Sequence, residues 1–513
     1  MKITFIYPDI IGSASYRGSF YLGIGILSAS LKQNGFDTSL IHITKTIDKD
    51  DFVKRVKKEQ AQLYAFSSTT LMFGFTREWC GWIKESAVDA PVLLGGVHPT
   101  LYPQEALDSS EADFVCVGEG EEALVDLCRQ LDSGGRVDSI ANIWAKARGR
   151  IFKNDPRPLV TDLDKLPFAD RTIFNYSYLT ESREGTAFFM ASRGCPYNCP
   201  YCCNHKLRLV YSNKDSWVRF RSVDNLIGEI KEVKAKNPFL KSVAFYDDIL
   251  ALRKDWFREF TKAYQQQINL PFRCNMRVEL LAEEENLKML KSAGCYRVIV
   301  GLESGNERLR KKILKRKMSN DIFVKAGMLC KKYGIELATY NMLGLPGEKP
   351  VDLLDTLKLN ARALTDFNYA SIFYPFAGTE LYELCRSQNI LTGSKVTDYV
   401  EDTVLNFSRL NKQRILFVRN YFKGLVGFYK AAYRLRPAVG SLAIKIFEKA
   451  VFSRIGCWVL CPLANLIFKS ARENKFLSKI NGLLKSYKQR RKALYIKKFL
   501  TNKKTGYEEK IRA

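Results

Sequence analysis

The chain has 513 residues, of which 46% are hydrophobic, 12% aromatic and 26% charged, with 32 Gly and 16 Pro. This is the composition of an ordinary globular protein; it excludes a disordered, collagen-like or coiled-coil chain, and the length allows about three domains. The formal net charge is +27, of which the segment from Arg409 onward carries +22, with 26 Lys and Arg against 4 Asp and Glu. Such a basic tail indicates an anionic partner, either nucleic acid or an acidic membrane surface.

The 13 cysteines occur in a chain without a signal-peptide pattern, which predicts a reducing, cytoplasmic compartment. Clustered cysteines in such a compartment bind metal more often than they form disulfides. The opening residues MKITFIYPDI lack a sustained apolar segment and a cleavage site, so we expect them to form a strand. The longest uncharged apolar stretch, 455–468, contains Pro462 and is shorter than the roughly 20 residues of a membrane span, so no transmembrane helix is predicted.

Residues 1–135 alternate short apolar runs with amphipathic segments, which predicts a doubly wound, Rossmann-like parallel sheet with helices on both faces. Such a sheet binds its ligand beyond the carboxyl ends of the strands. The predicted strands cover residues 3–7, 38–43, 63–67, 92–94 and 114–117, with a helix near 23–34. The turn residues that we expect to contact a ligand are Ser67, Ser68, Gly95, Gly96, His98, Gly118, Glu119 and Gly120.

Residues 136–184 have no strong periodicity and contain several prolines, so we interpret them as a linker with one or two short strands. A second strand–helix alternation over residues 185–390 predicts a partial (β/α)6 barrel. Residues 391–513 are predicted to form a basic α-helical C-terminal region. The barrel strands are expected at 187–192, 242–246, 272–276, 297–301, 336–342 and 370–374.

A cysteine motif directly follows the first predicted barrel strand. Cys195, Cys199 and Cys202 have C-x3-C-x2-C spacing on one short loop. Three thiolates can bind three irons of a cubane cluster and leave the fourth iron open to a substrate or cofactor. A zinc site normally takes a fourth Cys or His, and Cys203 and His205 lie near enough in the chain to keep zinc as an alternative, beside a structural coincidence. The spacing favours the iron–sulfur cluster.

The motif resembles that of the radical S-adenosylmethionine (radical SAM) superfamily, whose C-x3-C-x-aromatic-C pattern is matched with Tyr201 before Cys202. The resemblance implies a [4Fe–4S] cluster whose open iron binds S-adenosylmethionine. It further implies reductive cleavage to a 5′-deoxyadenosyl radical that abstracts hydrogen from a substrate. Agreeing motifs at later strand ends are Tyr246-Asp247-Asp248, Cys274-Asn275-Met276-Arg277, Gly301-Leu302-Glu303-Ser304-Gly305 and Gly344-Leu345-Pro346-Gly347-Glu348.

Two carboxylates are candidates for binding S-adenosylmethionine. Polar groups at strand carboxyl ends are where a barrel places its site, and Asp247 and Glu303 are acceptors suited to a ribose hydroxyl or an ammonium group. The superfamily's Gly-Gly-Glu is absent here, so Asp247 and Asp248 remain alternatives for that role. Each carboxylate has the alternative of a capping or solvated residue, and residues 344–348 have the alternative of a turn that caps a helix.

Residues 95–100 and 113–121 resemble the cobalamin-binding domain that precedes the barrel in cobalamin-dependent radical SAM enzymes. Glycines would let the backbone approach a corrin closely. The Asp-x-His-x-x-Gly loop that supplies an axial histidine in one cobalamin-binding class is absent, so no histidine of that motif ligates cobalt. The alternative is a degenerate doubly wound domain whose glycines serve turns alone, with His98 supporting the loop.

A second cluster, as in methylthiotransferases, is a further alternative, with Cys80, Cys116 and Cys128 as its ligands. The gaps of 36 and 12 residues fit that family poorly, and the C-terminal region has no recognisable nucleic-acid-binding β-barrel. The sequence therefore disfavours a methylthiotransferase.

The tail from residue 409 interleaves basic residues with aromatic and aliphatic ones. This pattern fits an interfacial membrane helix, a phosphate-binding surface or a helical cap on the barrel. We favour an anionic membrane over nucleic acid, because clusters such as residues 488–492 are attracted to an anionic leaflet and residues 455–468 offer apolar area for insertion.

The resemblance implies an enzyme that most often methylates an unactivated carbon, with radical cyclisation or oxidation as alternatives. A membrane-associated tail suits a lipid or other small-molecule substrate at the inner membrane face. The cluster must be reduced, which implies a flavodoxin or ferredoxin as electron donor. The sequence identifies no catalytic residue. A hypothesis from another class is a sensor that binds the cluster or cobalamin and holds nucleic acid with its tail.

Overall fold

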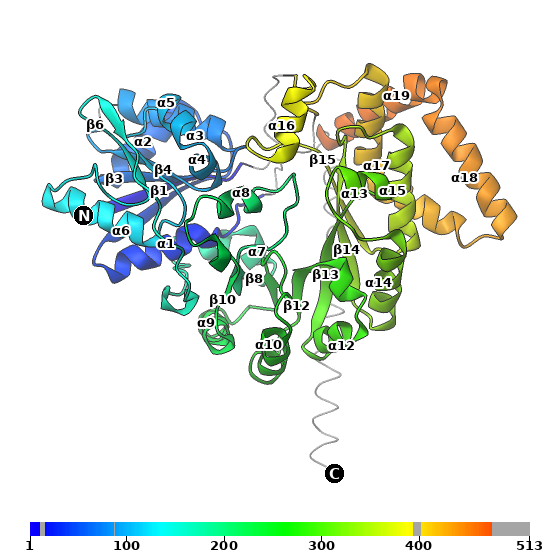
Figure 1. Cartoon of the computed structure of the whole chain (residues 1–513), viewed down its shortest axis with the longest axis horizontal. Coiled ribbons are helices and arrows are strands. Elements are labelled where there is room, and N and C mark those ends of the chain that lie inside the picture. The colour runs from blue at the N-terminus through cyan, green and yellow to red at the C-terminus, as the bar shows by residue number, and fades with distance from the viewer. Residues whose placement is uncertain (11–15, 87, 393–401, 474–513) are drawn as a thin grey trace, which may run out of the picture. The chain divides into compact units, whose positions relative to one another are not determined.

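The computed structural model describes residues 1–10, 16–86, 88–392 and 402–473, which divide into two compact units (Figure 1). The first unit comprises residues 1–240, 246–248 and 375–383. The second comprises residues 241–245, 249–374 and the described residues from 384 onward. The basic cluster predicted at residues 488–492 lies outside the described residues.

The first unit is built on a seven-stranded sheet in the order β2-β1-β3-β4-β5-β6-β7. Strands β1 to β5 are parallel, and β6 and β7 are antiparallel to their neighbours. The parallel part confirms the doubly wound sheet, while β6 and β7 come from the segment interpreted as a linker. The strands are β1 Lys2–Pro8, β2 Asp37–Ile43, β3 Leu63–Ser67, β4 Val92–Gly95, β5 Phe114–Cys116, β6 Ile143–Ala147 and β7 Arg150–Phe152.

Helices cover both faces of this sheet, and each face has its own apolar core. In Figure 1, α1 and α6 lie below the sheet and α2, α3 and α5 lie above it. Because both faces are buried, the strands are apolar along most of their length, as the sequence pattern required. The α-helices of residues 1–240 in the first unit are α1 Leu22–Gln33, α2 Lys49–Glu59, α3 Phe73–Glu85, α4 Val97–Leu101, α5 Pro103–Asp108, α6 Glu121–Ser133, α7 Thr180–Arg183, α8 Asn204–Arg208 and α9 Val223–Lys236.

The strand predicted at 187–192 is divided in the structure. Strand β8, Thr186–Phe189, ends early, and β9, Ser192–Arg193, pairs antiparallel with β10, Arg219–Phe220. The buried Asp247 carboxylate accepts hydrogen bonds from the Ala191 N–H (3.0 Å) and the Ser192 hydroxyl (2.5 Å). This carboxylate turns the chain out of the strand and into the β9–β10 ribbon.

The second unit contains five parallel strands in the order β15-β14-β13-β12-β11. With β8 of the first unit, all six predicted barrel strands are present, and the predicted α/β class is confirmed. The strands are β11 Ser242–Phe245, β12 Phe272–Met276, β13 Cys295–Glu303, β14 Glu336–Leu343 and β15 Phe367–Ile372. The helices between them are α10 Lys254–Gln267, α11 Val278–Leu281, α12 Glu284–Ser292, α13 Glu307–Lys312, α14 Asn320–Lys332 and α15 Pro350–Arg362.

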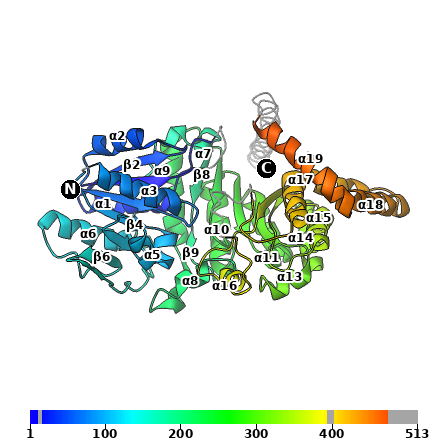
Figure 2. The same cartoon turned by 90° about the horizontal axis from the view of Figure 1, so that it is seen from above.

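The basic C-terminal region is helical, as predicted: after α16 Glu380–Ser387 come α17 Arg409–Ala432, α18 Pro437–Phe452 and α19 Arg454–Glu473. Helix α17 begins at Ser408, whose hydroxyl accepts from the Asn411 N–H, and buries one face against α15 and β15. Helix α18 turns away from the strands (Figure 2), and α19 returns to pack along α17, where the Tyr421 hydroxyl donates to the Ala464 carbonyl (2.7 Å). Of the helices in the described ranges, none combines the length and apolar character needed to cross a bilayer.

Replacement of Phe422 tests the packing of α17 on the second unit. Its side chain is 3% exposed among Leu425, Val418 and the α15 leucines. We expect Phe422→Ala to lower the free energy of unfolding by about 3–5 kcal/mol, because it opens a cavity. Leu442 on α18 is 59% exposed, and Leu442→Ala should change stability by no more than about 0.5 kcal/mol. Chemical denaturation of both variants is the measurement, and equal effects would contradict this packing.

Candidate cofactor and active site

A cavity of about 650 Å³ lies within the first unit. Its wall is largely apolar and includes Phe5, Phe20, Leu27 and Leu124. The cavity brings together six of the eight turn residues that the sequence predicted to contact a ligand. These six residues are Ser67, Gly95, Gly96, Gly118, Glu119 and Gly120. Ser68 and His98 are absent from the lining.

Some glycines of the cavity wall are required by the protein's own backbone conformation and packing, and others are not. Gly96 has φ +98°, and a Cβ there would stand 2.7 Å from the Ser68 carbonyl oxygen. Gly118 has φ +94°, and a Cβ would stand 2.5 Å from the Tyr211 hydroxyl. The protein's own packing therefore demands glycine at both positions. A Cβ on Gly95 would approach no atom closer than 3.6 Å, so the chain leaves room there that a bound molecule can occupy.

His98 and Ser68 are buried beside the cavity wall. The His98 ring stacks on Phe73 at 3.9 Å between centroids and has no hydrogen-bond partner among the described residues. Burial lowers the pKa of His98 to about 4, so the ring is neutral at physiological pH. The Ser68 N–H donates to the Gly95 carbonyl (2.8 Å), and its hydroxyl accepts from Thr76. Both residues support the geometry of the turn.

The cysteine motif forms a half-buried loop that begins at the end of the β9–β10 ribbon. The Cys202 N–H donates to the Cys199 carbonyl (3.0 Å), which folds the loop back on itself. Burial raises the pKa of Cys195 to about 11, and the nearby Cys202 and Cys199 thiols add to the effect. A hydrogen bond from Cys203 lowers the pKa of Cys202.

No set of three or more His, Cys, Asp or Glu side chains in the described part of the chain stands at metal-binding distance. Ligation by Cys195, Cys199 and Cys202 therefore remains a prediction. His205, the sequence's alternative zinc ligand, is a buried residue of α8, and burial lowers its pKa.

Asp247 and Asp248 differ in position: the Asp247 carboxylate is buried inside the protein, whereas Asp248 lines the cavity. Asp247 is fully buried, binds the chain at Ala191 and Ser192, and has its pKa raised to about 6 by that burial. Asp248 lines the cavity, and its oxygens accept from the Asn204 amide at 3.1 Å. The structure therefore favours Asp248 over Asp247 as the carboxylate that meets a ligand.

Glu303 belongs to the second unit, at the end of β13, and has φ +65°. Its carboxylate pairs with Arg316 at 3.3 Å, and Arg316 also donates to the Gly301 carbonyl (2.7 Å). In the 344–348 motif, Glu348 accepts from the Gly344 N–H (2.5 Å) and closes the turn before α15. Burial raises the pKa of Glu348 to about 8.

Cys80, Cys116 and Cys128 are buried in the two cores of the first sheet. Cys80 lies in the core with α2 and α3, whereas Cys116 and Cys128 lie in the core with α1 and α6. The sheet separates them, so they do not form one ligand set.

Among the residues of the cavity wall that sequence reasoning missed are four polar or aromatic residues on either side of the cysteine motif: Arg193, Tyr211, Trp217 and Arg219. Only Arg193 carries a usable signal, since it stands two residues before Cys195. The others follow Cys195 by up to 24 residues without a recognisable pattern. The β9–β10 pairing brings Arg219 back beside Arg193, and the Tyr211 hydroxyl accepts from the Glu119 N–H.

A glycine-walled cavity at strand carboxyl ends, beside a three-cysteine loop, defines a class of enzyme that holds a large cofactor next to an iron–sulfur centre. Comparison with known proteins agrees. The family model for the radical SAM superfamily matches residues 190–359, and the model for the B12 binding domain matches residues 11–128.

An uncharacterized methyltransferase of Pyrococcus horikoshii is 25% identical over 83% of this chain and 90% of that protein. The anaerobic magnesium-protoporphyrin IX monomethyl ester cyclase of Rubrivivax gelatinosus is 24% identical over 75% of this chain and 70% of that protein. The cobalamin-dependent S-adenosylmethionine radical enzyme OxsB, solved with aqua-cobalamin bound, is 16% identical. It superimposes with a TM-score of 0.64 over 100% of this chain and 80% of that one.

The chain belongs to the radical SAM enzymes that carry an N-terminal B12-binding domain. Its cofactors are accordingly a [4Fe–4S] cluster, S-adenosylmethionine and cobalamin. The cavity fits this assignment, because its wall is largely apolar, the chain's own packing does not require the glycine at position 95, and the cysteine loop follows directly from that wall.

Substitution of His98 tests whether it supports the fold or contacts the cofactor. Because its folded pKa lies below the ordinary 6.5, the unfolded chain binds an extra proton between pH 6.5 and 4, and stability falls as the pH falls through that window. Between pH 7 and 4, protonation of His98 should lower the free energy of unfolding of wild type by about 3 kcal/mol. The His98→Phe variant should lack this contribution. Urea denaturation across this range is the measurement. The variant should still bind hydroxocobalamin, and loss of binding would show that His98 contacts the cofactor.

Proposed function

We propose that this enzyme transfers a methyl group to an unactivated carbon of a small-molecule substrate. One observation carries the proposal: residues of the B12-binding turns and the ribbon that leads into the cysteine loop line the same cavity. A corrinoid held by these turns would thus be bound close to the segment whose cysteines would hold the cluster. Methylation of an unactivated carbon requires this proximity, since one substrate carbon must lose a hydrogen atom and receive the methyl group.

When bound, the cluster and S-adenosylmethionine supply hydrogen-atom abstraction, and cobalamin supplies the methyl group. Cys195, Cys199 and Cys202 hold the cluster in this proposal. The turns at Gly95 and Gly118 hold the corrinoid, while Asp248, positioned by Asn204, accepts a hydrogen bond from a cofactor or substrate. The apolar wall excludes water, which would otherwise compete with the substrate.

Cyclisation is the second candidate, because a relative with similar coverage is named a cyclase. Both reactions begin with loss of a hydrogen atom from carbon, and they differ in the fate of that carbon. Incorporation of a labelled methyl group into the product separates them. Either reaction takes electrons from a donor such as a flavodoxin or ferredoxin, because the cluster must be reduced.

We also propose that the substrate is a lipid and that α18 and α19 rest on an anionic membrane surface at the cytoplasmic face. Leu442 and Ile446 on α18, and Ile455 and Trp458 on α19, are 59–79% exposed. Arg434, Arg436, Lys445 and Lys449 are exposed on or just before α18. Apolar side chains flanked by cations form the surface of an interfacial helix, and each cation contributes about 1 kcal/mol near an anionic leaflet.

The Cys199→Ala variant tests the enzymatic proposal. After anaerobic reconstitution with iron, sulfide and hydroxocobalamin, wild type should release 5′-deoxyadenosine only with reductant. Cys199→Ala should lose this activity at least 100-fold, because the cluster loses a ligand. Cys128→Ala, which changes a buried cysteine of α6 outside the loop, is the control and should keep it. A wild-type protein that takes up zinc and neither iron nor corrinoid would refute the proposal and favour a sensor.

Flotation with liposomes tests the membrane surface. Wild type should float with vesicles containing anionic phosphatidylserine and stay behind with pure phosphatidylcholine. The double variant Leu442→Glu and Trp458→Glu should lose flotation, since charge enters the inserting face. Phe239→Glu, at an 83% exposed phenylalanine of the first unit, is the control and should float. Unchanged flotation of the double variant would exclude this face.

A further inference from the structure

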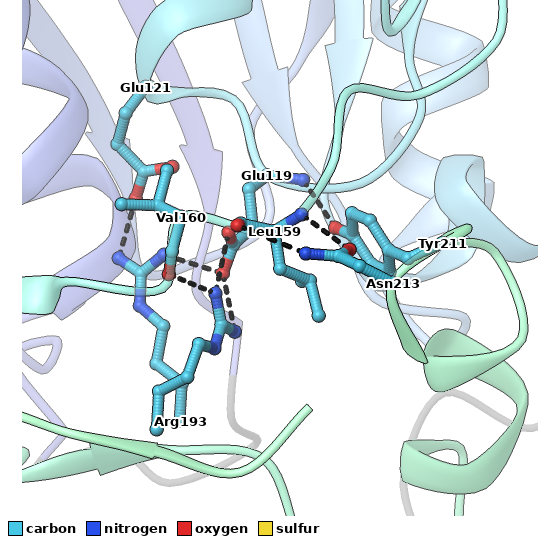
Figure 3. Close-up of polar contacts among 8 residues, drawn as sticks. Glu119, Glu121, Leu159, Val160, Arg193, Tyr211 and Asn213 are labelled. Carbon is cyan, nitrogen blue, oxygen red and sulfur yellow. Dashed lines mark hydrogen bonds and ion pairs between the residues drawn. The ribbon is translucent and has the colours of Figure 1, made fainter. Parts of the chain in front are cut away.

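A network of charges, in which Arg219 and Glu121 are buried and Glu119 and Arg193 are partly buried, joins the turn after β5 to the start of the cysteine loop, all within the first unit (Figure 3). The Glu119 carboxylate accepts from Arg193 Nη1 (2.9 Å) and from both terminal nitrogens of Arg219 (3.0 and 2.9 Å). Arg193 Nη2 donates to Glu121 (2.6 Å). One carboxylate is thus shared by two guanidinium groups.

The two arginines occupy directly opposite positions on the β9–β10 ribbon, where Arg219 pairs with Arg193. Like charges opposite each other on neighbouring strands destabilise a ribbon. Arg219 is 5% exposed, so water screens its charge little. The ribbon therefore depends on an acceptor between the two guanidinium groups, and Glu119 is the residue that supplies it.

The acceptor belongs to the turn that carries Gly118 and Gly120. The Glu119 N–H donates to the Tyr211 hydroxyl (2.7 Å), so the backbone of the turn is bound as well as its side chain. Arg219 also donates to the Val160 carbonyl (2.8 Å). Figure 3 shows Arg193 and Tyr211 approaching Glu119 from separate segments of the chain.

The β9–β10 ribbon is connected to the cysteine loop through one tightly packed residue. Gly194 separates Arg193 from Cys195 and has φ +88°. A Cβ on Gly194 would stand 2.2 Å from the Trp217 carbonyl oxygen, so the loop starts in direct contact with the segment before β10. A shift of Arg193 would therefore move the first cysteine.

The carboxylate of Glu119 is fully engaged by these arginines. Burial by itself would raise its pKa, but the hydrogen bonds from Arg219 and the charge of Arg193 lower the pKa below the ordinary value. An ionised group that already accepts three hydrogen bonds from two cations has little left to offer a ligand. This differs from the sequence prediction, in which Glu119 contacts the cofactor.

We propose that Glu119 is a positioning residue that locks the Gly118–Gly120 turn to the β9–β10 ribbon, so that the corrinoid turn and the cysteine loop move as one body. The functional meaning of this lock rests on the proposed function, since it would fix the methyl donor relative to the cluster. The contacts that form the lock are made by the chain's own residues and do not require a bound cofactor. Corrinoid binding at the turn should then slow opening of the loop, and by linkage a loaded cluster should tighten corrinoid binding.

Hydrogen exchange of the cofactor-free chain tests the lock directly. Glu119→Gln removes the charge between the arginines, and we expect amide exchange of residues 192–202 to rise at least tenfold, because a buried ion pair has lost one partner. Asp170→Asn, which removes a carboxylate bound to Ser28 and Lys32, is the matched control and should leave that exchange unchanged. Equal exchange in Glu119→Gln and wild type would overturn the proposal.

A second variant keeps the test valid if Glu119→Gln folds poorly. Glu119→Gln combined with Arg219→Gln removes one of the facing cations, and it should restore protection of residues 192–202 to within about threefold of wild type. A role of Glu119 limited to local folding or ligand contact predicts no such rescue, and a failed rescue would count against the lock.

Added hydroxocobalamin separates the lock from the proposed function. In wild type it should slow exchange of residues 118–121 and also of 192–202, whereas in Glu119→Gln only residues 118–121 should respond. Slowing of both segments in Glu119→Gln would overturn the lock. If wild type binds no corrinoid, the proposed function fails, while the exchange of the cofactor-free variants still decides whether the lock exists.

Discussion

Two arginines face each other across a two-stranded ribbon, and the first unit is organised around the carboxylate that neutralises them. Glu119 comes from the end of one sheet, and Arg193 and Arg219 come from the segment that leads into the cysteine loop. The cavity wall, the ribbon and the loop all meet at this interaction. A second carboxylate, Asp247, sets the ribbon's direction by bending the chain out of β8. These polar contacts, together with the apolar cluster of Leu159, Tyr211 and Trp217, hold the ribbon that leads into the cysteine loop beside the turn after β5.

The fold was largely predictable from the sequence, because strand and helix periodicity follow from burial. The apolar runs gave β1 to β5 and the barrel strands to within a few residues. The exception at β8 arises because alternation continues through Ser192, while a carboxylate 55 residues away binds that serine. The tail was predicted to be helical, but its pattern did not separate α17, which is buried in the second unit, from the exposed faces of α18 and α19.

The site was predictable only where chemistry imposes spacing. Three thiolates on one cluster require near neighbours in sequence, so Cys195, Cys199 and Cys202 are visible as a motif. Arg219 reaches the cavity through strand pairing with Arg193, and Tyr211 through a hydrogen bond from the Glu119 N–H, and no local pattern encodes either contact. Burial adds a distinction that the sequence does not show, because neighbouring residues of one turn point to different places. His98 and Asp247 face the interior, whereas Asp248 faces the cavity.

The contrast among the cavity glycines has a consequence for evolution. Gly96 and Gly118 are held by positive φ and by contacts with the chain itself, so they would persist even in a descendant that had lost its corrinoid. Gly95 has no such constraint and would drift to larger residues once the cofactor was gone. In a set of related sequences, the residue at position 95 would therefore distinguish working corrinoid domains from relics that keep only the architecture.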